Sequence, residues 1–278
     1  MTIVFKICLL LVFVAAAVSL ITYSFFWYEN AGGPRRRILE ASGKGLPRLM
    51  FQGMITGFAG LLVVMITYPL GFVPRLWRPK RISPSQPVII LTHGLYHNAA
   101  AWLFVRHRLR KAGFANVFVM NYRCLFTSFD ATFQKFEKFV LRSRSAAPGQ
   151  PLILVGHSLG GLLSRVYAER SSDQNAPAAV ITLGTPHRGS RMAAFAIGRL
   201  GRGLMYEGPL YHGFEREALR MRCPGIALIS PVDSLVLPAQ GLQAPYPGWT
   251  EYETVPVSHV AMLYSKAVAG KVIEFIKT

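Results

Sequence analysis

Short apolar runs alternate with longer amphipathic stretches over roughly the last 200 residues of the chain. The apolar runs have the length of buried strands and lie at 88–92, 116–120, 152–155, 178–183, 225–229 and 251–255. The stretches between and after them predict helices at about 99–112, 130–145, 159–170 and 260–277. Strands that alternate with helices form a parallel sheet with right-handed crossovers. We therefore predict one α/β domain, and its length suits a single hydrophobic core.

The N-terminal part of the chain has a different pattern, with two long apolar segments. These segments are free of charged residues over 22 and 26 positions. Each is long enough to cross about 30 Å of hydrocarbon as a helix. We therefore expect residues 1–75 to form a membrane anchor, with transmembrane helices at about 7–28 and 51–73. The α/β domain would then occupy residues 76–278.

The first apolar segment has a second interpretation, which is a cleaved signal peptide. The anchor is favoured because the segment is long and ends in aromatic residues of the kind found at membrane interfaces. In the second segment, the spacing of Gly53, Gly57 and Gly60 allows close helix packing, and we expect this segment to pack against the first. The alternative is that these glycines are merely tolerated in a membrane helix.

The charges that flank the two segments do not decide their orientation. The loop between them carries five basic residues, and the outer flanks carry about six positive charges including the amino terminus. The positive-inside rule therefore gives no preference. A two-helix hairpin does place both ends on one side of the membrane. We expect a multi-pass protein of a bacterial inner membrane, with the side that holds the α/β domain left open.

Residues 151–161 read Pro-Leu-Ile-Leu-Val-Gly-His-Ser-Leu-Gly-Gly, a strand that enters a helix through Gly-x-Ser-x-Gly. A side chain at Gly156 or Gly160 would collide with neighbouring backbone, so the turn is tight. Such a turn lifts Ser158 above the sheet and exposes its hydroxyl. It also sets the Leu159 N–H at the start of a helix, where it faces a developing oxyanion. This context predicts a nucleophilic serine.

A nucleophilic serine needs a base and an acid that orients the base. Of the three aspartates in the chain, Asp233 follows the apolar run 225–229 in a turn rich in Ser and Pro, where α/β sheets present functional side chains. His259 is the only histidine after Asp233 and precedes the last predicted helix. We predict that Asp233 is the acid and His259 the base. Glu251 and Glu253 are alternative acids on a predicted strand. The structural alternatives are a turn or cap role for Asp233 and a surface role for His259.

A second oxyanion donor is expected from the loop after the first predicted strand. This loop reads His-Gly-Leu-Tyr-His-Asn from position 93. Gly94 lets the backbone turn sharply, so the Leu95 N–H can point at the same spot as the Leu159 N–H. The two amides together predict an oxyanion hole.

With these motifs, the sequence resembles lipases and esterases of the α/β-hydrolase superfamily, particularly the bacterial triacylglycerol lipase type. The resemblance spans roughly residues 86–278. Its most specific part is Gly-His-Ser-Leu-Gly-Gly followed about 25 residues later by Thr-Pro-His-Arg-Gly-Ser at 185–190. The order Ser158, Asp233, His259 is also that of the superfamily. The resemblance implies the α/β-hydrolase fold, a mostly parallel sheet flanked by helices, with a lid at about 190–222.

Neither a cofactor nor a metal is expected. Secreted lipases of this type often hold calcium between aspartates, and this chain has only three aspartates. The cysteines leave one question open. Cys8 lies in the first apolar segment, and Cys124 and Cys223 either form a disulfide or stay as buried thiols, with the thiols favoured.

The chain is strongly basic, with a formal net charge of +18. After the expected anchor there remain 25 Lys and Arg against 11 Asp and Glu. Such an excess favours anionic surfaces. The chain has no recognised nucleic-acid motif, so we expect an anionic phospholipid surface as partner and no nucleic acid. The expected lid interleaves arginines with apolar residues, which suits either a segment that lies on a bilayer or an ordinary solvated cap.

The sequence thus predicts a membrane-anchored serine hydrolase that cleaves lipid-like carboxylic esters through an acyl-enzyme on Ser158. A phospholipase, a lysophospholipase or an acyltransferase on the same triad is the alternative. A catalytically inactive hydrolase fold that serves as a membrane scaffold is an alternative of another class. The natural substrate, its chain length and the oligomeric state are left open.

Overall fold

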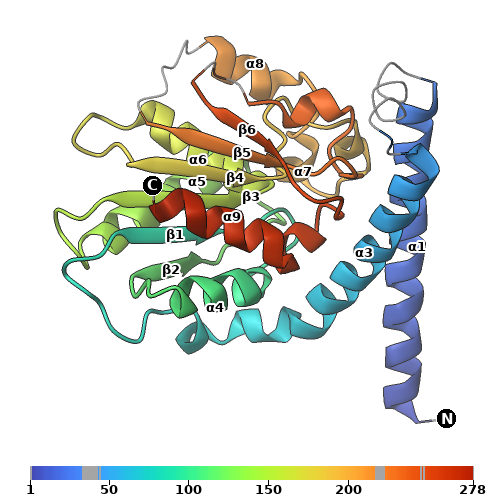
Figure 1. The fold of residues 1–278 in the computed structure, drawn as a ribbon, viewed down its shortest axis with the longest axis horizontal. Coiled ribbons are helices and arrows are strands. Elements are labelled where there is room, and N and C mark those ends of the chain that lie inside the picture. The colour runs from blue at the N-terminus through green and yellow to red at the C-terminus, as the bar shows by residue number, and fades with distance from the viewer. Residues whose placement is uncertain are drawn as a thin grey trace.

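The structure, a computed structural model, describes residues 2–32, 43, 45–216, 223–244, 246 and 248–277. Its centre is a six-stranded sheet in the order β2-β1-β3-β4-β5-β6, in which every neighbouring pair is parallel (Figure 1). The strands are β1 (Val88–Thr92), β2 (Val117–Met120), β3 (Leu152–His157), β4 (Ala179–Leu183), β5 (Gly225–Ile229) and β6 (Thr250–Glu253). All six predicted strands are therefore confirmed to within two residues.

The central strands were predictable because both faces of the sheet are covered. Every residue of β1 and β3 is buried, so these strands read as continuous Val, Ile and Leu runs. The edge strand β6 is different, since all four of its residues are exposed. On one face of the sheet lie α5 (Phe129–Arg144) and α6 (Leu159–Arg170). On the other lie α4 (Leu103–Lys111) and α9 (Lys266–Lys277), which Figure 1 shows in front of the strands.

Two of the expected helices begin with a separate short turn. The segment expected at 99–112 starts as a 3-10 turn, η3 (Ala99–Trp102), and continues as α4. The segment expected at 260–277 contains the 3-10 turn η6 (Ala261–Tyr264), and Ser265 then adopts an extended conformation before α9 begins. The prediction of one continuous helix from 260 was wrong, because hydrophobic periodicity does not reveal a break at a single capping residue.

Two long apolar helices precede the sheet. They are α1 (Ile3–Ala31) and α3 (Leu46–Thr67), and α3 continues into the 3-10 turns η1 (Tyr68–Phe72) and η2 (Pro74–Leu76). By length and composition both helices are candidate membrane spans, although a signal sequence or a buried core helix meets the same criteria. Figure 1 shows α3 running obliquely along the α/β domain toward α4, while the N-terminal part of α1 diverges from α3 and extends away from the domain.

Small residues allow α1 and α3 to pack closely. A Cβ built on Gly53 would overlap the ring of Tyr23, and one built on Gly57 would lie 3.0 Å from the hydroxyl of Ser19. The Ser19 hydroxyl also donates to the carbonyl of Met54 over 2.7 Å. Gly53 and Gly57 therefore face the first helix, as their spacing predicted, whereas Gly60 faces Ala261 instead.

Candidate active site

Ser158 occupies a strained turn between β3 and α6. Its backbone has φ 54° and ψ −123°, in the left-handed half of conformational space that residues other than glycine rarely enter. A Cβ on Gly156 would overlap the backbone of Gly160, and a Cβ on Gly160 would overlap the carbonyl of Thr92. The two glycines therefore permit the turn, and Ser158 is half-buried at its apex. Leu159 begins α6, as the motif predicted.

Asp233 and His259 form a buried hydrogen-bonded pair. The Nδ1 atom of His259 lies 2.6 Å from Oδ2 of Asp233. The other carboxylate oxygen of Asp233 accepts the backbone N–H groups of Leu235 and Val236, each over 2.9 Å. Because a carboxylate accepts, Nδ1 of His259 carries the proton in this contact. The Nε2 atom is then the nitrogen that can accept a proton from a nucleophile.

The end of β4 lies between Ser158 and the Asp233–His259 pair. The Ser158 N–H donates to the carbonyl of Leu183 over 2.9 Å. The next residue, Gly184, has φ +53°, and a Cβ there would lie 3.0 Å from Nδ1 of His259 and 3.1 Å from Oδ2 of Asp233. The predicted nucleophile, acid and base are thus gathered at the carboxyl edge of neighbouring strands. Sequence reasoning missed Gly184, although it directly precedes the Thr-Pro-His-Arg-Gly-Ser motif.

The loop after β1 passes directly against the nucleophile. A Cβ on Gly94 would lie 2.9 Å from the Cβ of Ser158, so only glycine brings the backbone this close. Tyr122, which follows β2, holds this loop in place. Its hydroxyl donates to the carbonyl of His93 over 2.6 Å, and its ring stacks on the His93 imidazole. Leu95 follows Gly94 in this loop, and its side chain contacts Gly201 of the segment between β4 and β5.

Three further histidines surround the site as neutral side chains. Burial lowers the pKa of His93 to about 4 and the pKa of His97 to about 3. Burial also holds the pKa of His157 well below its usual range, and His157 donates from Nε2 to the carbonyl of His259 over 3.0 Å. Uncharged imidazoles next to His259 do not repel the positive charge that a proton would bring to it. Sequence reasoning gave His157 no role, because nothing local indicates a contact 102 residues away.

The N-terminal helices hold both the acid loop and the base loop. The Tyr23 hydroxyl of α1 donates to the carbonyl of Val232 over 2.7 Å, and this bond is buried. The Ser258 N–H donates to the hydroxyl of Thr56 on α3 over 2.9 Å. A Cβ on Gly60 would lie 3.2 Å from the backbone nitrogen of Ala261. The residues flanking Asp233 and His259 therefore pack on α1 and α3, a contact that the sequence did not predict.

The segment expected as a lid lies between β4 and β5. Its described part contains η4 (Arg191–Phe195), α7 (Arg199–Arg202) and α8 (Pro209–Arg216), while residues 217–222 lie outside the described residues. The Tyr96 hydroxyl bonds to both the N–H and the carbonyl of Ile197, each over 2.7 Å. The segment is thus tied to the loop that carries Leu95.

The remaining candidates do not join the site. The carboxylate of Glu251 accepts the N–H of Ala244, and Glu251 and Glu253 are exposed on β6. His259 is already bonded to Asp233, so neither glutamate occupies the position of the acid. Cys124 and Cys223 are not joined by a disulfide, and burial raises the pKa of each thiol to about 11.

Sequence relatives include two esterases from rice. The chain is 34% identical to Esterase PIR7B of Oryza sativa subsp. japonica over 116 residues, which cover 40% of this chain and 43% of that protein. It is 32% identical to Probable esterase PIR7A of Oryza sativa subsp. indica over 108 residues, which cover 37% of this chain and 41% of that protein. The chain therefore matches less than half the length of these relatives.

Solved structures show the same fold at low sequence identity. The mature form of the Bacillus licheniformis lipase BlEst2 superposes with a TM-score of 0.59 and 16% identity, covering 71% of this chain and 94% of that chain. Aspergillus fumigatus lipase B superposes with a TM-score of 0.59 and 13% identity, covering 73% of this chain and 55% of that chain. A model described as the alpha/beta hydrolase family matches residues 89–270. Because that match spans well over half of the chain and its fold is the predicted α/β-hydrolase fold, the protein belongs to the alpha/beta hydrolase family.

Proposed function

We propose that the protein is a serine ester hydrolase that cleaves lipid-like carboxylic esters through an acyl-enzyme on Ser158. The observation that carries this proposal is the buried 2.6 Å contact between His259 and Asp233, which lies against Gly184, while Leu183 before it accepts the backbone N–H of Ser158 in its strained strand-to-helix elbow. Family membership and the esterase relatives agree with it. A serine held in this way has a base and an orienting acid, which are the parts that nucleophilic catalysis requires.

The proposed reaction has two halves. Ser158 Oγ attacks the acyl carbonyl while Nε2 of His259 takes the hydroxyl proton. Asp233 keeps the imidazole in the required tautomer and stabilises the imidazolium. His259 then returns the proton to the leaving alcohol, which departs and leaves the acyl-enzyme. Water attacks this ester by the reverse proton path, and Ser158 is regenerated. The mechanism needs no cofactor.

The N–H groups of Leu95 and Leu159 are the proposed oxyanion donors. Leu159 begins α6, so its N–H is among those that no carbonyl within the helix accepts. Leu95 follows Gly94, whose backbone contacts Ser158. Losing one such donor costs about 2.7–4 kcal/mol of transition-state stabilisation. These backbone groups therefore account for a large part of the expected rate.

We further propose that α1 and α3 attach the enzyme to a membrane and that the segment at 190–222 acts as its lid. The N-terminal half of α1 supports the first point, because its large apolar side chains are exposed, among them Ile3, Phe5 and Phe13. Exposed apolar rows of this kind are stable in lipid and unfavourable in water. The net charge supports an anionic lipid surface as partner.

A fluorophosphonate probe tests the proposed nucleophile. We expect the probe to label the purified protein covalently and to leave Ser158→Ala unlabelled. Ser85→Ala is the matched control, since Ser85 is exposed on a surface turn, and it should label like the wild type. Absence of labelling in wild-type protein whose circular dichroism shows a folded state would instead favour the inactive scaffold. Turnover of p-nitrophenyl esters of increasing chain length, followed by a phospholipid panel, separates a lipase from a phospholipase.

A further inference from the structure

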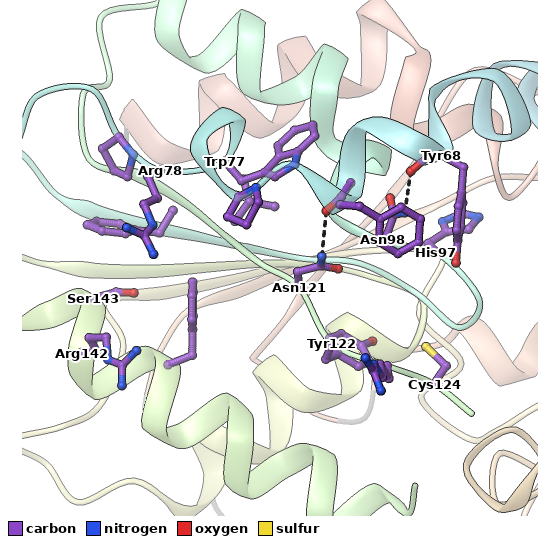
Figure 2. Close-up of a pocket in the computed structure, with 18 of the residues that line it drawn as sticks. Tyr68, Trp77, Arg78, His97, Asn98, Asn121, Tyr122, Cys124, Arg142 and Ser143 are labelled. Carbon is purple, nitrogen blue, oxygen red and sulfur yellow. Dashed lines mark hydrogen bonds between the residues drawn. The ribbon is translucent and has the colours of Figure 1, made fainter. Parts of the chain in front are cut away.

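A large pocket lies beside the active site and takes no part in the proposed reaction. Its volume is about 1260 Å³, at or above the upper end of the usual range for ligand sites. One wall is the segment that continues from α3, from Tyr68 to Ile82. The opposite wall is formed by β2, the loop after it and α5 (Figure 2).

One end of this pocket reaches the loop after β1, which carries Leu95. Tyr96, His97 and Asn98 line it there, and they directly follow the proposed oxyanion donor Leu95. The ring of His97 lies 5.7 Å, centroid to centroid, from the ring of His157, which precedes Ser158. The wall is held in place because Asn98 donates to the carbonyl of Tyr68 over 2.8 Å, the upper dashed line in Figure 2. A ligand in the pocket would therefore lie against the loop that shapes the active site.

The other end of the pocket is positively charged. Figure 2 shows Arg78 and Arg142 at the end away from His97, on opposite walls. Arg123 also lines the pocket, whereas no described lining residue is a carboxylate. Among the described ion pairs, none involves these three arginines. Guanidinium groups without a carboxylate partner are complementary to an anionic group of a ligand.

The mouth of the pocket carries exposed apolar side chains. Phe126 is 102% exposed, and it adopts φ 57°, a left-handed conformation that is costly for a bulky residue. Phe72 on the opposite wall is 68% exposed. Aromatic side chains held in water in this way are stabilised when they enter an apolar phase. The mouth therefore suits a ligand that is a lipid or that enters the pocket from a lipid phase.

We propose that this pocket binds a single-chain anionic lipid, with its charged group between Arg78 and Arg142 and its acyl chain directed toward His97. The proposal goes beyond ester hydrolysis, because the bound lipid need not be cleaved. Two sources share this chemistry, which are a fatty acid released by hydrolysis and a lysophospholipid from the membrane.

The fluorescence of Trp77 provides a direct measurement of lipid binding, since this side chain lines the pocket. The full-length Ser158→Ala protein in non-ionic detergent is titrated with dibromostearate, which quenches tryptophan fluorescence on contact. We expect saturable quenching that is lost in Trp77→Phe. The uncharged methyl ester of dibromostearate should bind about tenfold more weakly, which corresponds to about 1.4 kcal/mol.

Charge variants isolate the headgroup contact. The double variant Arg78→Ala, Arg142→Ala should bind dibromostearate about tenfold more weakly, again about 1.4 kcal/mol. Both arginine side chains are exposed, so the two substitutions leave the core intact. The matched control is Arg110→Ala with Lys135→Ala, which removes two exposed positive charges outside the pocket and should bind like the parent.

Two results would overturn the proposal. One is equal binding of dibromostearate and its methyl ester, and the other is unchanged binding in the Arg78 and Arg142 double variant. A brominated lysophosphatidylglycerol replaces the fatty acid in a second titration, and the tighter ligand identifies the source. Lipid binding is measured on the Ser158→Ala protein, whereas the proposed esterase is tested by fluorophosphonate labelling of the wild type. The two experiments are independent, so failure of the lipid-site proposal is distinguishable from failure of the esterase proposal.

Discussion

His259 donates from Nδ1 to Asp233, and this contact determines which ring nitrogen faces the proposed reaction. Asp233→Asn keeps the shape of the side chain but favours the other tautomer of the imidazole. We expect kcat to fall by about 10⁴-fold with little change in KM, as happens when the acid of a serine triad is replaced by its amide. Steady-state kinetics on a soluble ester measures both constants.

The alternative acid on β6 provides the control for this prediction. Glu251→Gln alters an exposed carboxylate that is bonded to a neighbouring backbone N–H, so kcat should stay at the wild-type value. If Glu251→Gln abolished activity and Asp233→Asn did not, the acid would be wrongly assigned.

Single residues differ in how far the sequence could predict them. Ser158 was predictable because its turn requires glycines at fixed local positions. The contact between Asp233 and His259 was predictable because the proposed mechanism fixes their order and the chain offers few alternatives, and their catalytic roles stay predictions. His157 and Gly184 were not, since each acts through contacts with residues distant in the chain.

Among the secondary-structure elements, the two apolar helices bear most directly on the site. The sequence shows that α1 and α3 are apolar around most of their circumference. It therefore does not indicate which face of each helix packs against the rest of the protein. The sequence therefore suggested that the aromatic residues ending the first apolar segment, Tyr23 among them, lie at a membrane interface, whereas the Tyr23 hydroxyl donates to the carbonyl of Val232 in the loop of Asp233. The strands were easier to predict, because burial on both faces leaves a continuous apolar run.

Tyr23→Phe tests whether α1 positions the acid loop. The variant leaves the buried carbonyl of Val232 without its donor, which costs about 1–3 kcal/mol. We expect kcat to fall several-fold at unchanged KM, because the loop that carries Asp233 is displaced while the loop after β1 and the Ser158 elbow are not. Ser24→Ala, on the exposed side of the same helix, should leave kcat unchanged. A Tyr23→Phe enzyme with wild-type kcat and reduced stability would limit the contact to a structural role.

Removal of residues 1–67 tests whether α1 and α3 serve only as an anchor or are also a structural part of the enzyme. Tyr23, Phe26 and Leu49 form one buried cluster with Val232 and Leu237, so truncation would expose apolar surface beside Asp233. We expect the truncated protein to aggregate, or to remain folded with greatly reduced fluorophosphonate labelling. Size-exclusion chromatography and labelling measure the two outcomes. A soluble fragment with full activity would show that the helices serve only as an anchor.

At the scale of the whole molecule, the proposed site and the apolar helices meet at the carboxyl ends of the strands, and the large pocket runs from there along the edge strand β2. The loops after β5 and β6 contact α1 and α3, and the loop after β1 separates Ser158 from the pocket. The net charge of +18 was evident from composition, but the gathering of Arg78, Arg123 and Arg142 at one cavity depends on the fold. With the proposed membrane attachment and the proposed triad, a substrate from a bilayer would meet both surfaces together.

Buried histidines should make the folded protein sensitive to acid. Burial lowers the pKa of His93 to about 4 and the pKa of His97 to about 3, and burial together with Arg165 holds the pKa of His187 well below its usual range. In the unfolded chain each takes up a proton near pH 6.5. Below that pH the unfolded state therefore binds more protons than the folded state, so acid favours unfolding.

The free energy of unfolding should consequently fall as the pH drops from about 6.5 toward about 4, by up to about 1.4 kcal/mol per pH unit for each such histidine. Above pH 6.5 these groups contribute no pH dependence, because they are neutral in both states. Denaturant unfolding in mild detergent at a series of pH values measures this slope. His187→Gln, which lies outside the proposed triad, should reduce the slope by the share of one histidine, whereas the exposed His107→Gln should leave it unchanged. A profile that is flat between pH 4.5 and 7 would contradict the lowered pKa values of these side chains in the folded state.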